Sequence, residues 1–236
     1  MNILIPAAGA GKRFKAAGYG MSKPLILVDG TPMVTQVIRN VSQPGDSIVM
    51  LAPRGVLVYG ARTIVVDEVT DGAARTALLA KNYINHGPLV IVNADQLVDW
   101  PHGIHDFYQF AVQYDGAVVC FAELTGNPKW SFADLADDSA LIKRIAEKDP
   151  ISLYATVGIY YWKRAWDFFY YAEQMIARDV RTNGEFYIAP VYNEAIADGA
   201  RIAGYVVPSE NVHGLGTPED LNAYHEWLAK RKRIGV

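Results

Sequence analysis

A run of small residues followed by two cations lies directly after the first apolar segment of the chain. The run is, in order, Pro6, Ala7, Ala8, Gly9, Ala10, Gly11, Lys12, Arg13 and Phe14. Small residues let backbone N–H groups approach an anion closely, and the two cations can neutralise its charge, so this pattern is typical of a phosphate-binding loop. A tight turn with surface charges would use the same residue types, and both interpretations stay open at this point.

Two common phosphate-binding loops do not fit this run. A P-loop needs glycine at the position of Pro6, and Ser or Thr after the lysine, where Arg13 stands. A dinucleotide-binding fingerprint needs a third glycine, where Phe14 stands. If the loop binds phosphate, it belongs to another class.

Further motifs follow the loop in a defined order. They are Lys23-Pro24-Leu25, Gly30-Thr31-Pro32-Met33, Asp71-Gly72-Ala73-Ala74, Val92-Asn93-Ala94-Asp95, Glu147-Lys148, Val157-Gly158-Ile159-Tyr160 and Gly216-Thr217-Pro218-Glu219-Asp220-Leu221. Together with the Gly-x-Gly-x-Arg pattern of the loop, they resemble the sugar-phosphate nucleotidylyltransferases, also called nucleoside-diphosphate-sugar pyrophosphorylases. The resemblance extends over nearly the whole chain.

The resemblance implies a definite reaction, in which a phosphorylated acceptor attacks the α-phosphorus of a nucleoside triphosphate and expels pyrophosphate. The attacking phosphate has a second pKa of about 6, so it is already anionic and needs no general base. Catalysis would then consist of positioning and electrostatic stabilisation by Mg²⁺, arginine and lysine. The lack of a plausible Ser-His-Asp order or Cys-His pair agrees with this chemistry.

The resemblance also implies roles for individual residues. Arg13 would hold the β- and γ-phosphates, Lys23 would act at the α-phosphate or the acceptor, and Asp95 would bind Mg²⁺. The acceptor would contact Lys23, Ser131, Glu147, Lys148 and Gly158, with Lys148 also catalytic, and the nucleotide would contact residues 7–13 and Gly72. The structural alternatives are solvated loop charges at 12–13, a helix N-cap at Asp95, an exposed charge pair at 147–148 and a packing glycine at 158.

Three positions depart from the family pattern. Gly214 stands where the family commonly has an aspartate as second metal ligand, so Mg²⁺ would depend on Asp95, water and substrate phosphates, or on a carboxylate from elsewhere. Asp67 and Glu68 replace a glutamine that contacts the nucleobase in the family. The identity of the nucleobase therefore stays undetermined, and a pyrimidine is weakly favoured. Bulky residues at 129–132 replace a glycine beside the sugar, so the acceptor could be a hexose 1-phosphate, another sugar or polyol phosphate, or phosphocholine.

The elements that would position these motifs alternate along the chain. Strands are predicted at Asn2–Pro6, Ser47–Ala52, Thr63–Val66, Leu89–Asn93, Ala117–Ala122, Ala155–Tyr161 and Ile202–Val207. Helices are predicted at Met33–Asn40, Ala73–Ile84, Ile104–Gln113, Ala165–Ala177, Phe186–Ala197 and from Pro218 onward.

This alternation, with strands that are apolar on both faces, predicts an α/β fold with one doubly wound, mostly parallel sheet of the Rossmann-like nucleotidyltransferase type. The segment Asp134–Lys148 predicts a small inserted hairpin at the sheet edge. Ligands bind outside the carboxyl ends of such strands, where the loops at 7–23, 71–74 and 94–97 should lie.

The composition limits the classes of protein that the chain can belong to. With 236 residues, of which 51% are hydrophobic, it fits a single domain spanning 1–236. A net charge of -3 gives no overall attraction to nucleic acid or acidic membranes. The single cysteine, Cys120, excludes an intramolecular disulfide framework and a thiolate zinc cluster. Without a recognisable signal peptide or membrane span, we expect a cytoplasmic protein whose partners are a nucleoside triphosphate and a phosphorylated small molecule.

The favoured expectation is a Mg²⁺-dependent nucleotidyltransferase that makes an activated precursor for surface polysaccharide, and its oligomeric state is open. A glycosyltransferase that uses a nucleotide sugar is an alternative, although such enzymes normally carry Asp-x-Asp at the strand end, where this chain has Asp95-Gln96-Leu97. A non-catalytic nucleotide-binding relative is a further alternative, suggested by Gly214.

Overall fold

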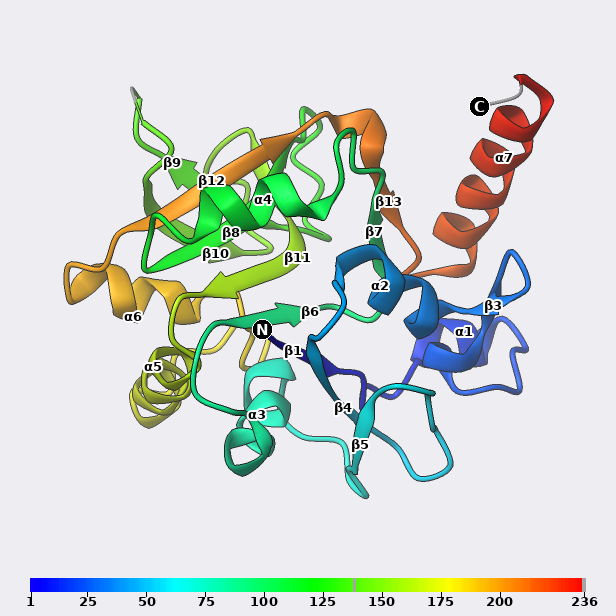
Figure 1. Cartoon of the computed structure of the whole chain (residues 1–236), viewed down its shortest axis with the longest axis horizontal. Helices are drawn as coiled ribbons and strands as arrows, with labels where there is room; N and C mark the ends of the chain where they lie inside the picture. Colours follow the sequence, from blue (N-terminus) through cyan, green and yellow to red (C-terminus); the bar gives the residue numbers. More distant parts are fainter. Residues whose placement is uncertain (138, 235–236) are drawn as a thin grey trace.

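The computed structural model describes residues 1–137 and 139–234, and within them a nine-stranded mixed sheet forms the centre of an α/β fold (Figure 1). The sheet follows the order β10-β9-β11-β6-β1-β4-β5, and β8 and β12 continue outward from β11. Its strands are β1 (Asn2–Pro6), β4 (Ser47–Ala52), β5 (Arg62–Val65), β6 (Leu89–Val92), β8 (Gly116–Ala122), β9 (Ser131–Leu135), β10 (Ile142–Glu147), β11 (Tyr154–Trp162) and β12 (Ile202–Val207). Two small ribbons pair β2 (Leu27–Val28) with β3 (Thr31–Pro32) and β7 (Gln96–Val98) with β13 (Val212–Gly214).

Helices cover both faces of the sheet, so the fold is doubly wound. They are α1 (Lys12–Ala16), α2 (Met33–Val41), α3 (Ala73–Leu78), α4 (Ile104–Ala111), α5 (Ala165–Ala177), α6 (Val191–Ala197) and α7 (Pro218–Ile234), with short 3-10 turns η1 (Lys23–Leu25), η2 (Lys81–Tyr83) and η3 (Ser209–Asn211). One core cluster contains the buried faces of α2 and α4, and the other contains those of α3, α5 and α6. In Figure 1, α7 lies at one end of the molecule, near β13 and the β2–β3 ribbon.

The core strands show why both faces can be covered. Along β1, Ile3 and Ile5 belong to one core cluster, and Leu4 between them belongs to the other. Successive side chains of a strand point to opposite faces, so a strand that is apolar at every position needs a hydrophobic layer on each side. Strand β1 pairs in parallel with β4 and β6, and β4 pairs in parallel with β5. The antiparallel strand β11 then joins this half to β8 and β12, which are parallel to each other.

The predicted fold class is therefore confirmed, and so are most element positions. The inserted hairpin is present as β9 and β10, although it begins at Ser131, earlier than predicted, and residue 138 lies outside the described residues. The helix predicted over Phe186–Ala197 is wrong in its first half, because α6 begins only at Val191. Pro190 disfavours helical backbone in the residue before it, and the backbone of Phe186 is already hydrogen-bonded to residues 71 and 74.

The helix predicted over 73–84 is likewise shorter, with α3 ending at Leu78 before the 3-10 turn η2. The short helix α1 was not predicted, because five residues are too few to show a helical period. Among the described residues, no helix is both long enough and apolar enough to cross a membrane.

Candidate active site

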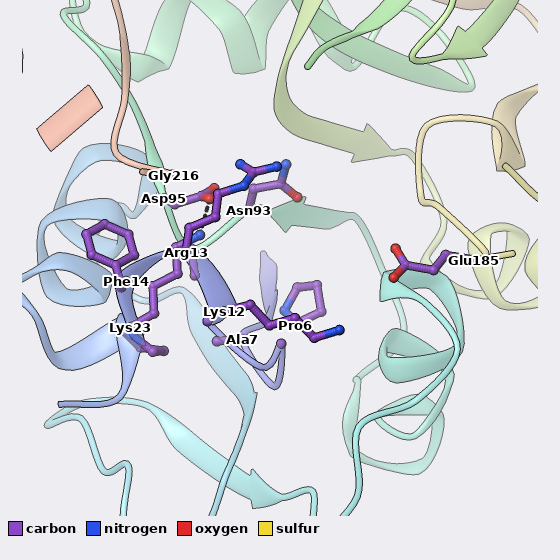
Figure 2. Close-up of a pocket in the computed structure, with 14 residues that line it drawn as sticks. Pro6, Ala7, Lys12, Arg13, Phe14, Lys23, Asn93, Asp95, Glu185 and Gly216 are labelled. Carbon is purple, nitrogen blue, oxygen red and sulfur yellow. Dashed lines mark hydrogen bonds and ion pairs between the residues drawn. The ribbon is translucent and has the colours of Figure 1, made fainter. Parts of the chain in front are cut away.

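Two adjoining cavities open at the carboxyl ends of β1 and β6, as expected for an open parallel sheet. The first has a volume of about 410 Å³ and lies beside the glycine-rich loop, and the second has about 290 Å³ and lies beside the β9–β10 hairpin. Arg13, Asn93 and Asp95 line both cavities, so a ligand in one would meet a ligand in the other at these three residues. Figure 2 shows the first cavity.

The glycine-rich loop forms one wall of the first cavity. Ala7, Gly9, Gly11, Lys12 and Arg13 line it, whereas Ala8 is buried in the core and Ala10 is not among its lining residues. Helix α1 follows the loop directly, and its Phe14, which is only 1% exposed, anchors the helix to the core. The cationic side chains of Lys12 and Arg13 are exposed, and neither forms an ion pair within the described part of the chain.

Lys23 and Asp95 face each other in the first cavity and form an ion pair. Lys23 begins η1, whose Pro24 is buried, and Asp95 follows shortly after the end of β6. The two side chains are 23% and 22% exposed, so both can reach a ligand. Strand β7 begins at Gln96, so the alternative interpretation of Asp95 as a helix N-cap is wrong.

The predicted acceptor residues line the second cavity. Ser131 is 6% exposed and donates a hydrogen bond from its Oγ to the carboxylate of Glu147, on the neighbouring strand of the hairpin. Burial raises the pKa of Glu147, against the opposing effects of this hydrogen bond and of the Lys148 charge. The Glu147 carboxylate is therefore partly shielded from solvent. This contradicts the alternative interpretation of residues 147–148 as an exposed charge pair.

Lys148 follows Glu147 with an unusual backbone conformation, at a φ of 58°. Its Nζ donates a hydrogen bond to the hydroxyl of Tyr187 and lies 4.6 Å from the centre of the Tyr187 ring. Its backbone N–H donates to the carbonyl of Trp130 at 3.0 Å. These contacts hold an ammonium group in the wall of the second cavity, where a phosphate could replace the tyrosine hydroxyl as its partner.

Two predicted glycines have a packing explanation, and neither is among the residues that line the two cavities. A Cβ on Gly72 would collide with the backbone of Phe186, which accepts a hydrogen bond from Ala74 and donates one to Asp71. A Cβ on Gly158 would collide with the side chains of Asn93 and Gln96. Both glycines also have a positive φ, at 133° and 79°, which other residues rarely adopt. Their ligand contacts stay predictions.

Several residues of the site were not predicted from the sequence. Asn93 lies in both cavities, Glu185 lies in the first and Tyr187 in the second. Figure 2 shows Glu185 across the first cavity from Lys23 and Asp95. Asn183-Gly184 is a strong turn dipeptide that could have revealed the tight turn before Glu185. No local pattern marks Tyr187, because its contact with Lys148 depends on residues far along the chain.

A divalent cation would find one carboxylate, that of Asp95, in the wall shared by the two cavities. The described residues contain no group of three or more His, Cys, Asp or Glu side chains with metal-binding geometry. A closed structural metal site is therefore not indicated. The arrangement fits Mg²⁺, which is commonly held by one or two carboxylates together with substrate phosphates.

Structural comparison gives the same fold over almost the whole chain. A nucleoside-diphosphate-sugar pyrophosphorylase from Vibrio cholerae has a TM-score of 0.78 at 24% identity, covering 94% of this chain and 98% of its own. A UDP-glucose pyrophosphorylase solved with UDP-glucose has a TM-score of 0.76 at 18% identity, covering 95% and 98%. An inositol-1-phosphate CTP transferase from T. maritima has a TM-score of 0.72 at 16% identity, covering 100% and 96%.

The comparison with curated proteins finds no match. In the comparison with family models, residues 3–149 match the MobA-like NTP transferase domain. That range begins in β1 and ends just after Lys148, so it contains the glycine-rich loop, the Lys23–Asp95 pair and the whole β9–β10 hairpin. The resemblance found in the sequence motifs is thereby confirmed, and the chain belongs to the MobA-like NTP transferase family.

Proposed function

We propose that this chain transfers a nucleoside monophosphate from a nucleoside triphosphate to a phosphorylated small molecule, with release of pyrophosphate. The observation that carries the proposal is the meeting of two cavities at Arg13, Asn93 and Asp95. One cavity has the backbone and cations that suit a triphosphate, and the other has the carboxylate, hydroxyl and ammonium groups that suit a hydroxylated phosphate. The bond to be made would lie where the two meet.

The transfer needs no protein base. An oxygen of the acceptor phosphate forms a new bond to the α-phosphorus, the bond from this phosphorus to the bridging oxygen breaks, and pyrophosphate leaves with the electron pair. Because the acceptor is already an anion near neutral pH, the residues have to bring two anions together and stabilise the departing charge.

Cationic side chains at the junction would supply most of this stabilisation. Arg13 lies in both cavities, and its planar guanidinium can contact two phosphate oxygens at once. Lys12 would contact the triphosphate from the loop, and Lys23 would act near the α-phosphate. Mg²⁺ held by Asp95 and substrate phosphates would neutralise charge on the triphosphate and help to orient it.

The second cavity would position the acceptor. Lys148 would bind its phosphate, while Glu147 and Ser131 would bind its hydroxyl groups. Asn93, which also lines both cavities, would orient substrate where the two ligands meet. A sugar 1-phosphate satisfies these groups well, because it combines one phosphate with several hydroxyls.

The identity of the product extends the proposal. The similar structures include two pyrophosphorylases of nucleotide sugars, which supports a nucleotide sugar as the product here. Such a product would serve as an activated precursor for surface polysaccharide, and the reaction would take place in the cytoplasm, where nucleoside triphosphates are made.

A thermal-shift panel with pyrophosphate detection tests the proposal. Each nucleoside triphosphate and several nucleotide sugars are added with and without Mg²⁺, since a ligand at about 100 times its Kd stabilises the native state by roughly 2.7 kcal/mol. We expect one triphosphate to raise the Tm in a Mg²⁺-dependent way, and the same triphosphate to release pyrophosphate only when a sugar 1-phosphate is present. Shifts with nucleotide sugars alone would favour a glycosyltransferase, and no shift with any ligand would favour a non-catalytic relative.

A further inference from the structure

Asp220, in the first turn of α7, lies directly beside the place where a side chain at position 214 would begin. A Cβ built on Gly214 would lie 3.5 Å from the carboxylate carbon of Asp220 and 3.6 Å and 3.7 Å from its two oxygens. Position 214 is where the sequence resemblance led us to expect an aspartate, and here an acidic side chain comes close to the same place from six residues further along the chain.

The carboxylates of Asp220 and Asp95 both lie close to Gly216. A Cβ built on Gly216 would lie 3.1 Å from Oδ2 of Asp95 and 3.7 Å from Oδ2 of Asp220, so the two oxygens flank one small region beside this glycine. Figure 2 shows Gly216 directly beside Asp95 in the wall of the first cavity. A side chain at 216 would contact both carboxylates.

Backbone contacts hold this arrangement in place. The N–H of Leu215 donates to the carbonyl of Asp95 at 2.7 Å, which ties the end of β13 to the end of β6. Thr217 caps α7, since its Oγ1 accepts a hydrogen bond from the N–H of Asp220 at 3.1 Å. Pro218 suits the first helical position, where its missing N–H costs nothing. The cap therefore fixes the position from which the Asp220 side chain extends.

Each carboxylate is neutralised by a lysine that lines a substrate cavity. Asp95 pairs with Lys23 of the first cavity, and Asp220 pairs with Lys129 of the second, at 3.0 Å. The two lysines supply the positive charge that a divalent cation would supply in their place. Both lysines are partly exposed, at 23% and 40%, so they can turn towards substrate phosphates when the carboxylates bind a cation.

We infer that Asp220 is the second carboxylate ligand of the divalent cation, and that it takes the place of the aspartate absent at Gly214. The inference rests on the proposed function, because that function supplies the need for a cation beside Asp95. It goes further by assigning metal binding to Asp220, which the sequence resemblance gave no such role, and by offering a carboxylate that compensates for glycine at position 214.

Titration with Mn²⁺, followed by the electron paramagnetic resonance signal of the free ion, tests this assignment without any measurement of turnover. It is carried out on the full chain, alone and with the triphosphate that raises the Tm. We expect Asp220→Asn and Asp95→Asn each to weaken Mn²⁺ binding on the order of 10- to 100-fold, the range found even for groups that only hydrogen-bond to metal ligands. Glu219→Gln is the matched control, because it removes one negative charge from the adjacent position and should leave the affinity unchanged.

A rescue variant keeps the test informative if Asp220→Asn affects folding. Gly214 has no positive φ, and the atoms nearest to a Cβ at this position belong to the Asp220 carboxylate, so aspartate fits there once Asp220 is shortened. We expect the double variant Gly214→Asp with Asp220→Ala to regain Mn²⁺ affinity that Asp220→Ala alone has lost.

The possible failures are distinguishable. Unchanged Mn²⁺ affinity in Asp220→Asn, together with weakened affinity in Asp95→Asn, would overturn the role of Asp220 and leave the proposed function intact. A wild-type chain that binds no Mn²⁺ with or without nucleotide would overturn both. Loss of Mn²⁺ binding in Asp220→Asn, in a chain that releases no pyrophosphate with any triphosphate, would support the ligand and contradict the function.

Discussion

The cavity beside the glycine-rich loop and the cavity beside the β9–β10 hairpin present charge in different ways. In the first, Lys12 and Arg13 are exposed at the start of a short helix, next to a loop of small residues. In the second, Glu147 and Ser131 are hydrogen-bonded to each other on paired strands, and aromatic residues such as Tyr160 and Tyr187 complete the wall.

This difference indicates that the two cavities recognise their ligands in different ways. Backbone N–H groups and exposed cations can bind the phosphates of any nucleoside triphosphate, because they recognise charge more than shape. A half-buried carboxylate with a fixed hydrogen-bond partner is more selective, since it costs free energy unless the ligand offers groups that match it. We therefore expect the first cavity to contribute mainly to rate and the second mainly to the choice of acceptor.

The largest effect is expected at the junction of the two cavities. Arg13→Ala should lower kcat on the order of 10²- to 10³-fold, because it removes a cation placed to stabilise the departing pyrophosphate. Steady-state kinetics of pyrophosphate release would measure this, with Lys15→Ala as the control. Lys15 is an exposed cation of the same helix and lies in neither cavity. Near-normal turnover of Arg13→Ala would remove this residue from the mechanism.

An intermediate effect should separate the two cavities. Lys148→Met should raise the KM for the acceptor by about 10- to 100-fold, the equivalent of one lost hydrogen bond to a charged group at roughly 1.5–3 kcal/mol, while the KM for the triphosphate stays nearly constant. Lys12→Met should show the opposite pattern. If both variants raise the same KM, the division between the cavities is wrong.

The smallest effect concerns the pH dependence of stability. Burial raises the pKa of Glu147 in the folded chain, so folding favours its neutral form. The stability associated with this group is present below its ordinary pKa of about 4.5 and is lost as the pH rises through the higher pKa of the folded state. Glu147→Gln, which is always neutral, should therefore gain Tm relative to wild type between about pH 4 and neutral pH. Thermal melts at several pH values measure the difference, and a difference that does not change with pH would contradict the buried carboxylate.

The sequence alone allowed the fold class and several strands to be predicted. Strands β1, β4 and β12 and helix α5 have the predicted bounds, because each combines a clear apolar pattern with clear end signals. The prediction of Phe186–Ala197 as one helix failed, because the local apolar pattern does not reveal that the backbone of Phe186 hydrogen-bonds to residues more than 100 positions earlier. The assignment of the chain as a single domain stays a prediction.

The order of residue types along the chain was enough to identify the segments that could contact phosphate, since small residues and cations after a buried strand have this property wherever the chain folds in this way. Which side chains contact one another could be learned only from the three-dimensional fold. Lys148 contacts Tyr187, Lys23 pairs with Asp95, and Asp220 lies beside Gly214 and Gly216. Local patterns extend over a few residues, whereas most of these contacts join residues from distant parts of the chain. They depend on the order of the strands and on the cap that begins α7. The proposal of Asp220 as a metal ligand therefore required the folded structure.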